Sequence, residues 1–495
     1  MRLKALILLL TLGAAHAWAA DPATAIGEER LGLWHVASLP WQNPAVNQWR
    51  MDCGLTRVGA GYSHESAGTD RDARFGRGGH NWSVGADTYT KYRTSTLWGA
   101  AKYANGLLKD AVWNETADYD IVYPYILADS IGGDLHREQY SFSGGYADHS
   151  GRWAWGAELS YLATLEYRDV DPRPRNVVGT LDAAAGAAYR IAGDYYAGVS
   201  FNFRKYKQSN DIDFKSEMGV DKIFHLTGMG THYRRFAGTA LSTYYDGYRY
   251  GVGADIYPAS GHGFFVSVAM SRFSFDNILS DLNKLPMASA WHKTIAVEAG
   301  WLARADRFYG GVSARTAAYR RHGSENVFGD AAAGIFPQIG SNEMYADNGT
   351  SAGLKGLWGL KSGTLRVAAV ADAEWQRRVT TYIEPWRHST VNAVAASLGA
   401  GADFVLPHSW LLGAGASVRF YSPFSCDMAY GSAGSDSETV QLDNIEMEAY
   451  RLASTHRTRG AARISAAHTV ADRYMVQAAA EMRHHDYTFS LSVIF

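Results

Sequence analysis

Beyond its first twenty residues the chain has no apolar run long enough to form a transmembrane helix. Such a helix needs about 20 consecutive apolar residues, so an inner-membrane helical bundle is excluded. Cys53 and Cys426 are the only cysteines, and the topology derived below places them near opposite ends of the molecule, so we expect no disulfide. The formal net charge is only −2 and both signs are interspersed, which gives no support for nucleic-acid binding.

Proline is scarce and aromatic residues are abundant, a combination that soluble proteins seldom show. The chain has 12 Pro against 51 Gly, 30 Tyr and 15 Trp, and its mean hydropathy is −0.22. A transmembrane β-barrel uses aromatic residues in two interfacial girdles while its inner face stays polar. The composition therefore favours a barrel.

The first residues have the pattern of a secretory signal peptide. Arg2 and Lys4 precede an apolar stretch that ends in small residues, and we expect cleavage after Ala17 or Ala19. We assign residues 1–19 to this signal, residues 20–54 to a periplasmic or lumenal lead-in without strand character, and residues 55–495 to the barrel. Neither a lipid anchor nor a plug domain is expected.

Many segments alternate apolar and polar residues with period two, as strands with two different faces do. In residues 153–168, the odd-numbered residues are mostly apolar and include Trp153, Trp155 and Leu159. The even-numbered residues include Glu158 and further charged residues. Residues 195–204, 365–376, 410–421 and 487–495 behave in the same way. A soluble β-sandwich also alternates, but its strands usually have about five or six residues, whereas these keep their parity for longer.

The connections predict the strand number. Eight short turns are expected, near residues 93–94, 148–152, 191–194, 257–263, 304–307, 361–363, 406–409 and 471–473. Longer polar connections are expected at 108–137, 207–244, 277–288, 321–349 and 423–455. With an opening strand at 55–64 and a closing strand that ends at Phe495, the sequence predicts an all-β, antiparallel transmembrane barrel of about 14–18 strands. Its short turns would be periplasmic and its long loops external. Residues 224–236 could be a strand pair or a loop.

Two stretches resemble known families. Trp41-Gln42-Asn43-Pro44-Ala45 resembles the Asn-Pro-Ala lead-in of barrels similar to long-chain fatty-acid transporters. The general run of the lead-in, residues 232–236 and the Phe-terminated last strand are similar to an uncharacterised Bacteroidota outer-membrane barrel family. The second resemblance implies location in the bacterial outer membrane and a barrel fold, and it implies no substrate.

No catalytic, metal or cofactor site is predicted. His484-His485-Asp486 lies at an expected external turn, and His322 follows two arginines, but neither has a partner at the spacing that a catalytic or metal site needs. The glycine-rich pieces lack the residues of a phosphate-binding loop. We expect the protein not to be an enzyme.

Charged residues on the inward parity are the candidate pore-lining groups, because rings of such residues set solute preference in a water-filled pore. They are Glu158, Glu166, Arg204, Glu298, Arg366, Asp372, Glu374, Arg378 and Arg419. In a filled barrel they would instead form salt-bridged ladders that brace the wall, and the sequence leaves both readings open.

The leading functional hypothesis is a passive, porin-like channel for a small solute. Transport of a hydrophobic molecule is the first alternative, and a non-transporting scaffold that binds a partner through loops 321–349 and 423–455 is the second. The expected partners are outer-membrane lipid, the barrel-assembly machinery and a small solute.

Overall fold

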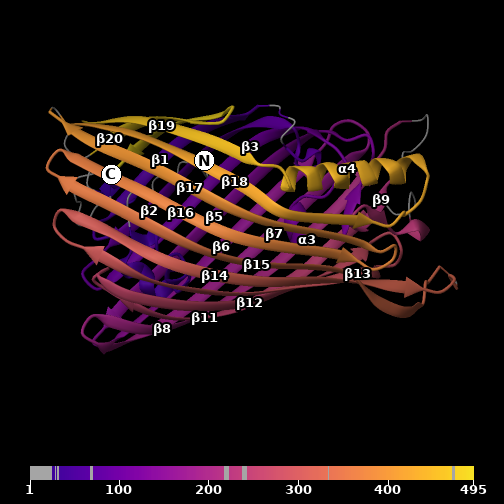
Figure 1. The fold of residues 1–495 in the computed structure, drawn as a ribbon, viewed down its shortest axis with the longest axis horizontal. Helices are drawn as coiled ribbons and strands as arrows, with labels where there is room; N and C mark the ends of the chain where they lie inside the picture. Colours follow the sequence, from indigo (N-terminus) through magenta and orange to yellow (C-terminus); the bar gives the residue numbers. More distant parts are fainter. Residues whose placement is uncertain are drawn as a thin grey trace, which may run out of the picture.

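The computed structural model describes residues 25–495 except 28, 30–32, 67, 69–70, 217–221, 237–241, 333, 408 and 471–473. Eighteen antiparallel strands form one closed barrel (Figure 1). The eighteen strands are β1 (Leu55–Glu65), β2 (Gly78–Lys91), β3 (Ser95–Ala111), β5 (Gly133–Ser150), β6 (Trp153–Tyr167), β7 (Arg173–Ala192), β8 (Tyr195–Asp213), β11 (Ser242–Pro258), β12 (Gly263–Leu279), β13 (Leu285–Arg304), β14 (Phe308–Phe328), β15 (Gln338–Ser362), β16 (Leu365–Tyr382), β17 (Arg387–Leu406), β18 (Trp410–Tyr430), β19 (Arg457–Val470), β20 (Tyr474–Arg483) and β21 (Asp486–Ile494).

The last strand closes the barrel against the first, as the sequence predicts. The register runs from Arg57 opposite Ile494 to His64 opposite Tyr487. Beyond this ladder, the amide of Phe495 donates to the carbonyl of Thr56 at 2.9 Å. Closure leaves no free sheet edge, and only a closed barrel of strands satisfies every backbone group in lipid.

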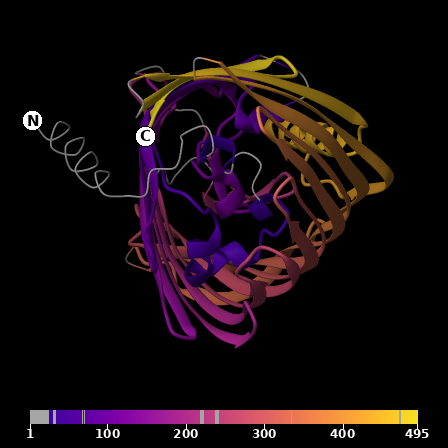
Figure 2. The same cartoon turned by 90° about the vertical axis from the view of Figure 1, so that its left-hand side faces the viewer.

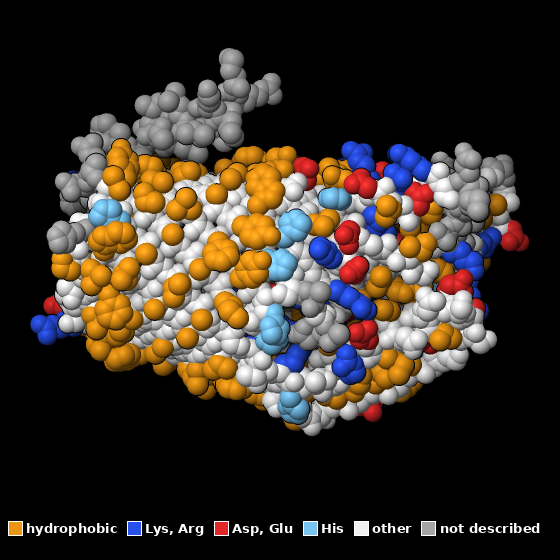
Figure 3. Space-filling view, turned by 90° about the horizontal axis from the view of Figure 1, so that it is seen from above, with side chains coloured by type: hydrophobic (Ala, Val, Ile, Leu, Met, Phe, Trp, Pro, Cys, Tyr) orange, Lys and Arg blue, Asp and Glu red, His pale blue; other side chains and the backbone are white. Residues whose placement is uncertain are grey.

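The outer face is apolar, as the alternating pattern predicts. Its outward residues include Trp155, Leu159, Val199 and Leu354, which are among the most exposed hydrophobic side chains of the protein. Figure 3 shows one side of this face, where hydrophobic side chains cover the half toward the short turns and charged side chains gather toward the other end. Such a band on a closed barrel is characteristic of outer-membrane proteins.

Shorter elements complete the structure at the end with the long connections, which we call the external end. They are the helices α3 (Tyr119–Val122) and α4 (Ser437–Ala453), the strands β4 (Ile126–Ala128), β9 (Phe224–Gly228) and β10 (Thr231–His232), and the 3₁₀ turns η5 (Ala73–Phe75) and η6 (Arg234–Phe236). At the opposite, periplasmic end lie the 3₁₀ turns η2 (Leu33–His35), η3 (Pro40–Gln42) and η4 (Pro44–Trp49). Among the described residues, no helix has the length and apolar character needed to cross a membrane.

One expected loop is largely strand, and another begins as strand. The hairpin of β14 and β15 continues to Phe328 and Gln338, so most of the expected loop at 321–349 belongs to the wall. Likewise β18 continues to Tyr430, into the expected loop at 423–455, whose remainder contains α4. The connection at 321–349 is thus much shorter than expected, whereas the one at 423–455 is long as expected and only begins later. Polar residues at the water-exposed end of a barrel strand look like loop residues, which explains both differences. Cys53 and Cys426 do not form a disulfide, as expected.

Candidate functional site

The described residues between 25 and 54, which are 25–27, 29 and 33–54, line the inside of the barrel near its periplasmic end (Figure 2). We call this segment the belt, because it runs around the inner wall. Its first residues, Ala25 and Ile26, and its last ones, Met51 and Cys53, enter the same apolar cluster with β18–β21. Between these points it packs against β12–β15 through Leu33 and Val36 and against β6–β8 through η4. The belt thus completes a circuit of the wall.

Asn43 explains the Asn-Pro-Ala motif. Its side-chain oxygen accepts from the amide of Ala45 at 3.0 Å and so caps η4, which Pro44 begins. Its side-chain nitrogen donates to the buried carboxylate of Asp255 on β11 at 2.9 Å. Proline at the first helical position and asparagine at the N-cap are both favourable. The motif therefore fixes the belt to the wall.

Wall glycines make room for this motif. A Cβ on Gly186 would lie 1.8 Å from the Asn43 side-chain oxygen, and one on Gly156 would lie 2.6 Å from the backbone of Pro44. These glycines are opposite each other on β6 and β7. The sequence shows them only as small residues on the polar parity, and the structure shows that they form the seat of the motif.

Glu298 holds the next part of the belt. Its carboxylate accepts from the amides of Ser38 at 2.8 Å and Leu39 at 2.6 Å. Arg315 on β14 donates to the hydroxyl of Ser38 at 3.2 Å. Charge-assisted hydrogen bonds of this kind are about twice as strong as neutral ones.

The external end of the lumen holds a second inserted structure, which we call the cap. It consists of η5, residues 112–132, residues 222–236 and α4. β4, β9 and β10 form a small separate sheet within it. Buried apolar residues of the cap pack against inward residues of β7, β8, β11, β12 and β13. Residues 224–236 are thus strands of the cap and not of the wall.

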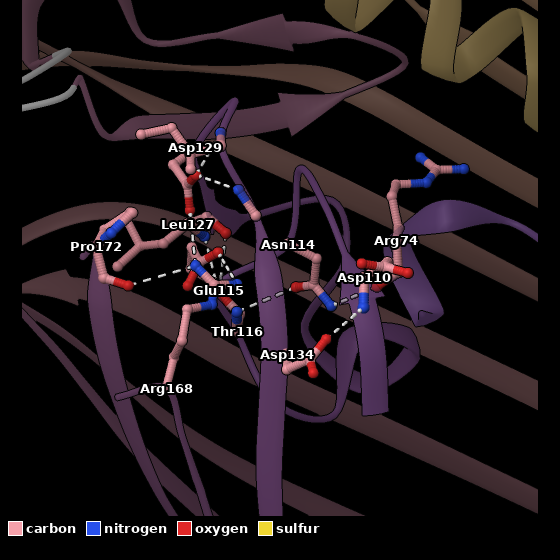
Figure 4. A network of polar contacts seen from close by, with 12 residues as sticks. Arg74, Asp110, Asn114, Glu115, Thr116, Leu127, Asp129, Asp134, Arg168 and Pro172 are labelled. Atoms are coloured by element: carbon pink, nitrogen blue, oxygen red, sulfur yellow. Dashed lines mark hydrogen bonds and ion pairs between the residues drawn. The ribbon is translucent and has the colours of Figure 1, made fainter. Parts of the chain in front are cut away.

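A buried polar network anchors the cap (Figure 4). Arg168, in the connection between β6 and β7, donates to the Glu115 carboxylate at 2.7 Å and lies 3.5 Å from the Asp129 carboxylate. All three side chains are almost completely buried. Burial and the nearby Asp129 raise the pKa of Glu115 well above its usual range, although Arg168 opposes this shift. Removing one partner from such a group typically costs about 3–5 kcal/mol.

Further ion pairs join separate parts of the cap to each other and to the wall. Arg74 of η5 lies 2.7 Å from Glu446 of α4. Arg387 at the start of β17 lies 2.6 Å from Asp443 of α4. Arg321 of β14 donates to the backbone carbonyl of Asp120 at 2.8 Å. Because the wall holds the cap at several points, its displacement would break several charged contacts together.

Two neighbouring cavities lie between the belt and the cap. The lower one, of about 500 Å³, is lined by Leu39 and Gln42 of the belt and by Glu158, Asp182, Arg204, Arg249 and Arg315 of the wall. The upper one, of about 540 Å³, is lined by Arg74, Tyr119 and Tyr123 of the cap and by Arg321, Glu374, Arg378 and Tyr421 of the wall. Both touch Tyr319. We call the two together the chamber.

The nine predicted pore-lining residues are distributed over five strands and do not form one site. Two pairs share a cavity, Glu158 with Arg204 in the lower one and Glu374 with Arg378 in the upper one. Others are engaged in contacts: Glu166 with Arg137, Glu298 with the belt, Arg366 beside Gly27, and Asp372 with Ser397. Arg419 lies on the inward parity between Ser397 and Arg459. Their role as pore-lining groups stays a prediction.

Several chamber residues were missed. Asp182 accepts from both Arg204 at 2.7 Å and Arg249 at 3.3 Å, and all three line the lower cavity. Arg249 alternates with Tyr248 and Tyr250, so its parity could have identified it. No sequence pattern marks Arg74, because it comes from a loop that folds back into the lumen.

The turn that contains the two adjacent histidines is stabilised by an ion pair. His484 and His485 form the turn between β20 and β21, and the Asp486 carboxylate pairs with Arg71 at 2.6 Å. Across the residues described here, no group of three or more His, Cys, Asp or Glu could hold a metal ion.

Comparisons with solved structures find barrels of low identity. The ferric preacinetobactin receptor BauA of Acinetobacter baumannii has 10% identity and a TM-score of 0.41, with 90% of this chain and 80% of that chain covered. A mutant of the ferric enterobactin receptor PfeA of Pseudomonas aeruginosa has 8% identity and a TM-score of 0.38, with 89% and 80% covered. The ferric-catecholate import receptor Fiu of E. coli has 10% identity and a TM-score of 0.36, with 89% and 81% covered.

The sequence comparisons give one assignment. No curated protein matches the sequence. Residues 44–494 match the profile of DUF6850, described as a family of unknown function. This match extends from the Asn-Pro-Ala motif of the belt to the end of the last strand, and the chain therefore belongs to that family.

Proposed function

We propose that the protein carries a small polar solute across the outer membrane through its lumen, and that the cap must move for the solute to pass. The solute would enter from the external end, reside in the chamber and leave past the belt. This proposal replaces a permanently open, porin-like channel with a closed one that opens.

The observation that carries the proposal is the polar chamber beneath an apolar, tightly packed cap. Arg204, Arg249 and Asp182 present both signs of charge to the lower cavity. Burying charged groups is costly unless they are paired or meet water or a polar ligand. A barrel that served only as a scaffold would not need a polar cavity in its lumen.

The two alternatives have less support. A carrier of hydrophobic molecules would need an apolar lumenal pocket, whereas both cavities are lined by charged side chains. Every neighbouring pair of barrel strands is joined by a ladder, so no gap in the wall suggests lateral release. A scaffold would bind its partner through external surfaces such as the β14–β15 hairpin. Such binding and transport through the lumen do not exclude each other. We do not propose an enzymatic role.

The test is conductance in planar bilayers after removal of part of the cap. Ala111 and Gly133 are paired on adjacent strands, so a short Gly/Ser linker can replace residues 112–132 without opening the wall. As a control, the same linker replaces His484 and His485, which form the turn between the paired residues Arg483 and Asp486 at the same end and line neither cavity. Folding of each variant is checked by the heat-modifiable gel mobility of closed barrels.

We expect steady conductance from the variant without residues 112–132 and little from the intact protein or the control. A large, constant conductance of the intact protein would refute the closed state. If the cap variant folds and stays silent, the lumen is blocked elsewhere and passage through the chamber is wrong.

A further inference from the structure

Three cations lie side by side on the outer face of the barrel. In the strand register, Arg272 of β12 is opposite Lys293 of β13, and Lys293 is opposite Arg320 of β14. Directly opposed side chains have their Cβ atoms about 4.5–5.5 Å apart, and like charges at such positions are destabilising. All three side chains are exposed. We call these residues the cation row.

No carboxylate of the described chain neutralises the row. Within the part of the chain that the structure describes, the side chains of Arg272, Lys293 and Arg320 have neither a hydrogen bond nor an ion pair. Two of the three contact Trp291, whose ring centre lies 4.8 Å from the Lys293 ammonium and 5.9 Å from the Arg272 guanidinium. A row of unneutralised charges on a membrane protein calls for an external anion.

The row marks the outer boundary of the apolar band. From the row toward the periplasmic turns, the outward residues of β12 and β13 are uncharged, and they include Met270, Val268 and Ile295. From the row toward the external end, Ser274 and Asp276 follow on β12. The three cations are therefore the first charges met on these strands at the level where lipid headgroups begin.

An apolar groove descends from the row. It has a volume of about 960 Å³ and is lined by the three cations together with Val252, Met270 and Ile295, among others. A ligand that fills it must have an anionic head and an apolar tail. A lipid with phosphate groups in its headgroup has both parts, and arginine is well suited to bind phosphate because its planar group can donate two hydrogen bonds.

We propose that this groove is a binding site for a phosphorylated glycolipid of the outer leaflet, with its phosphates on Arg272, Lys293 and Arg320 and an acyl chain in the groove. The site lies outside the barrel and is independent of the proposed transport role. Basic clusters at a headgroup layer recognise anionic lipids in the same way.

The test compares the full-length protein with two variants of equal charge change. R272Q/R320Q removes two cations from the row, and R419Q/R463Q removes two arginines from the inward parity of β18 and β19. Each purified protein in mild detergent is titrated with bisphosphorylated lipid A, with the dephosphorylated lipid and with inorganic phosphate alone. Binding is followed by native mass spectrometry and by the shift in Tm.

We expect bisphosphorylated lipid A to bind the unaltered protein and R419Q/R463Q alike, and to bind R272Q/R320Q at least about tenfold more weakly, since two charge-assisted hydrogen-bonding groups are lost. Equal binding by all three proteins would refute the site. Equal weakening in both variants would show a general charge effect and would also refute it. Binding of the dephosphorylated lipid with the same affinity, or the same Tm shift with inorganic phosphate, would overturn the lipid assignment.

Discussion

Substitution of Asn43 by alanine should loosen the belt without opening the barrel wall. The change removes the N-cap of η4, which costs about 1 kcal/mol. It also leaves the buried Asp255 carboxylate without its donor, which costs about 1–3 kcal/mol. Detachment of the belt should therefore become easier by about 2–4 kcal/mol, whereas the wall strands keep all of their ladder hydrogen bonds.

Hydrogen exchange of the peptide that contains residues 40–50 measures this detachment. Because each 1.4 kcal/mol is about a factor of ten in an equilibrium constant, exchange should accelerate by about 30-fold to 700-fold. The control is Asn392→Ala, which removes a hydrogen bond to the Ser425 carbonyl at the external end of the wall. This control should leave exchange at 40–50 unchanged. An Asn43→Ala protein with unaltered exchange there would show that the apolar contacts alone hold the belt.

Three further changes test the cap, the belt seat and the closure. Folding of the cap raises the pKa of Glu115, so the folded cap holds a proton that the unfolded segment releases. The free energy of unfolding of the cap therefore falls as pH rises above the ordinary glutamate pKa of about 4.3. Hydrogen exchange of residues 112–128, corrected for its intrinsic rate, should show more protection at acidic than at neutral pH, and Glu115→Gln should flatten this dependence; an unchanged slope would contradict the assignment. Gly186→Ala should push Asn43 off its seat at a cost of about 1–3 kcal/mol, seen as faster proteolysis of the belt, and an intact belt would refute the steric argument. Deletion of Phe495 removes both backbone hydrogen bonds to Thr56 and should lower the fraction of heat-modifiable barrel in the outer membrane, whereas normal insertion would count against its role in closure.

The barrel fold could be predicted because its signal is local. Successive strand residues face opposite sides, so the alternation in residues 153–168 or 487–495 reports lipid on one side and lumen on the other without knowledge of any partner strand. Short turns also appear in the sequence as brief interruptions of this alternation. These two signals predict about 14–18 strands, and the structure has eighteen.

The contents of the lumen could not be predicted in the same way. Nothing in residues 112–132 indicates that they fold back into the barrel, because their burial depends on Arg168 and on wall residues far away in the sequence. The same holds for Asn43, whose partner Asp255 is more than two hundred residues away. The Asn-Pro-Ala pattern is visible in the sequence, but its seat on Gly156 and Gly186 is not.

The sequence by itself determines which side chains of each strand face lipid and which face the lumen, because that choice follows from the two-residue period of a single strand. Only the tertiary structure decides which side chains become neighbours, because register between strands is a long-range property. Arg272, Lys293 and Arg320 are each more than twenty residues from the next, and the two ladders that join β12, β13 and β14 bring them into one row. Likewise, the belt and the cap decide how much of the lumen remains open, and they do so through contacts that no local pattern contains.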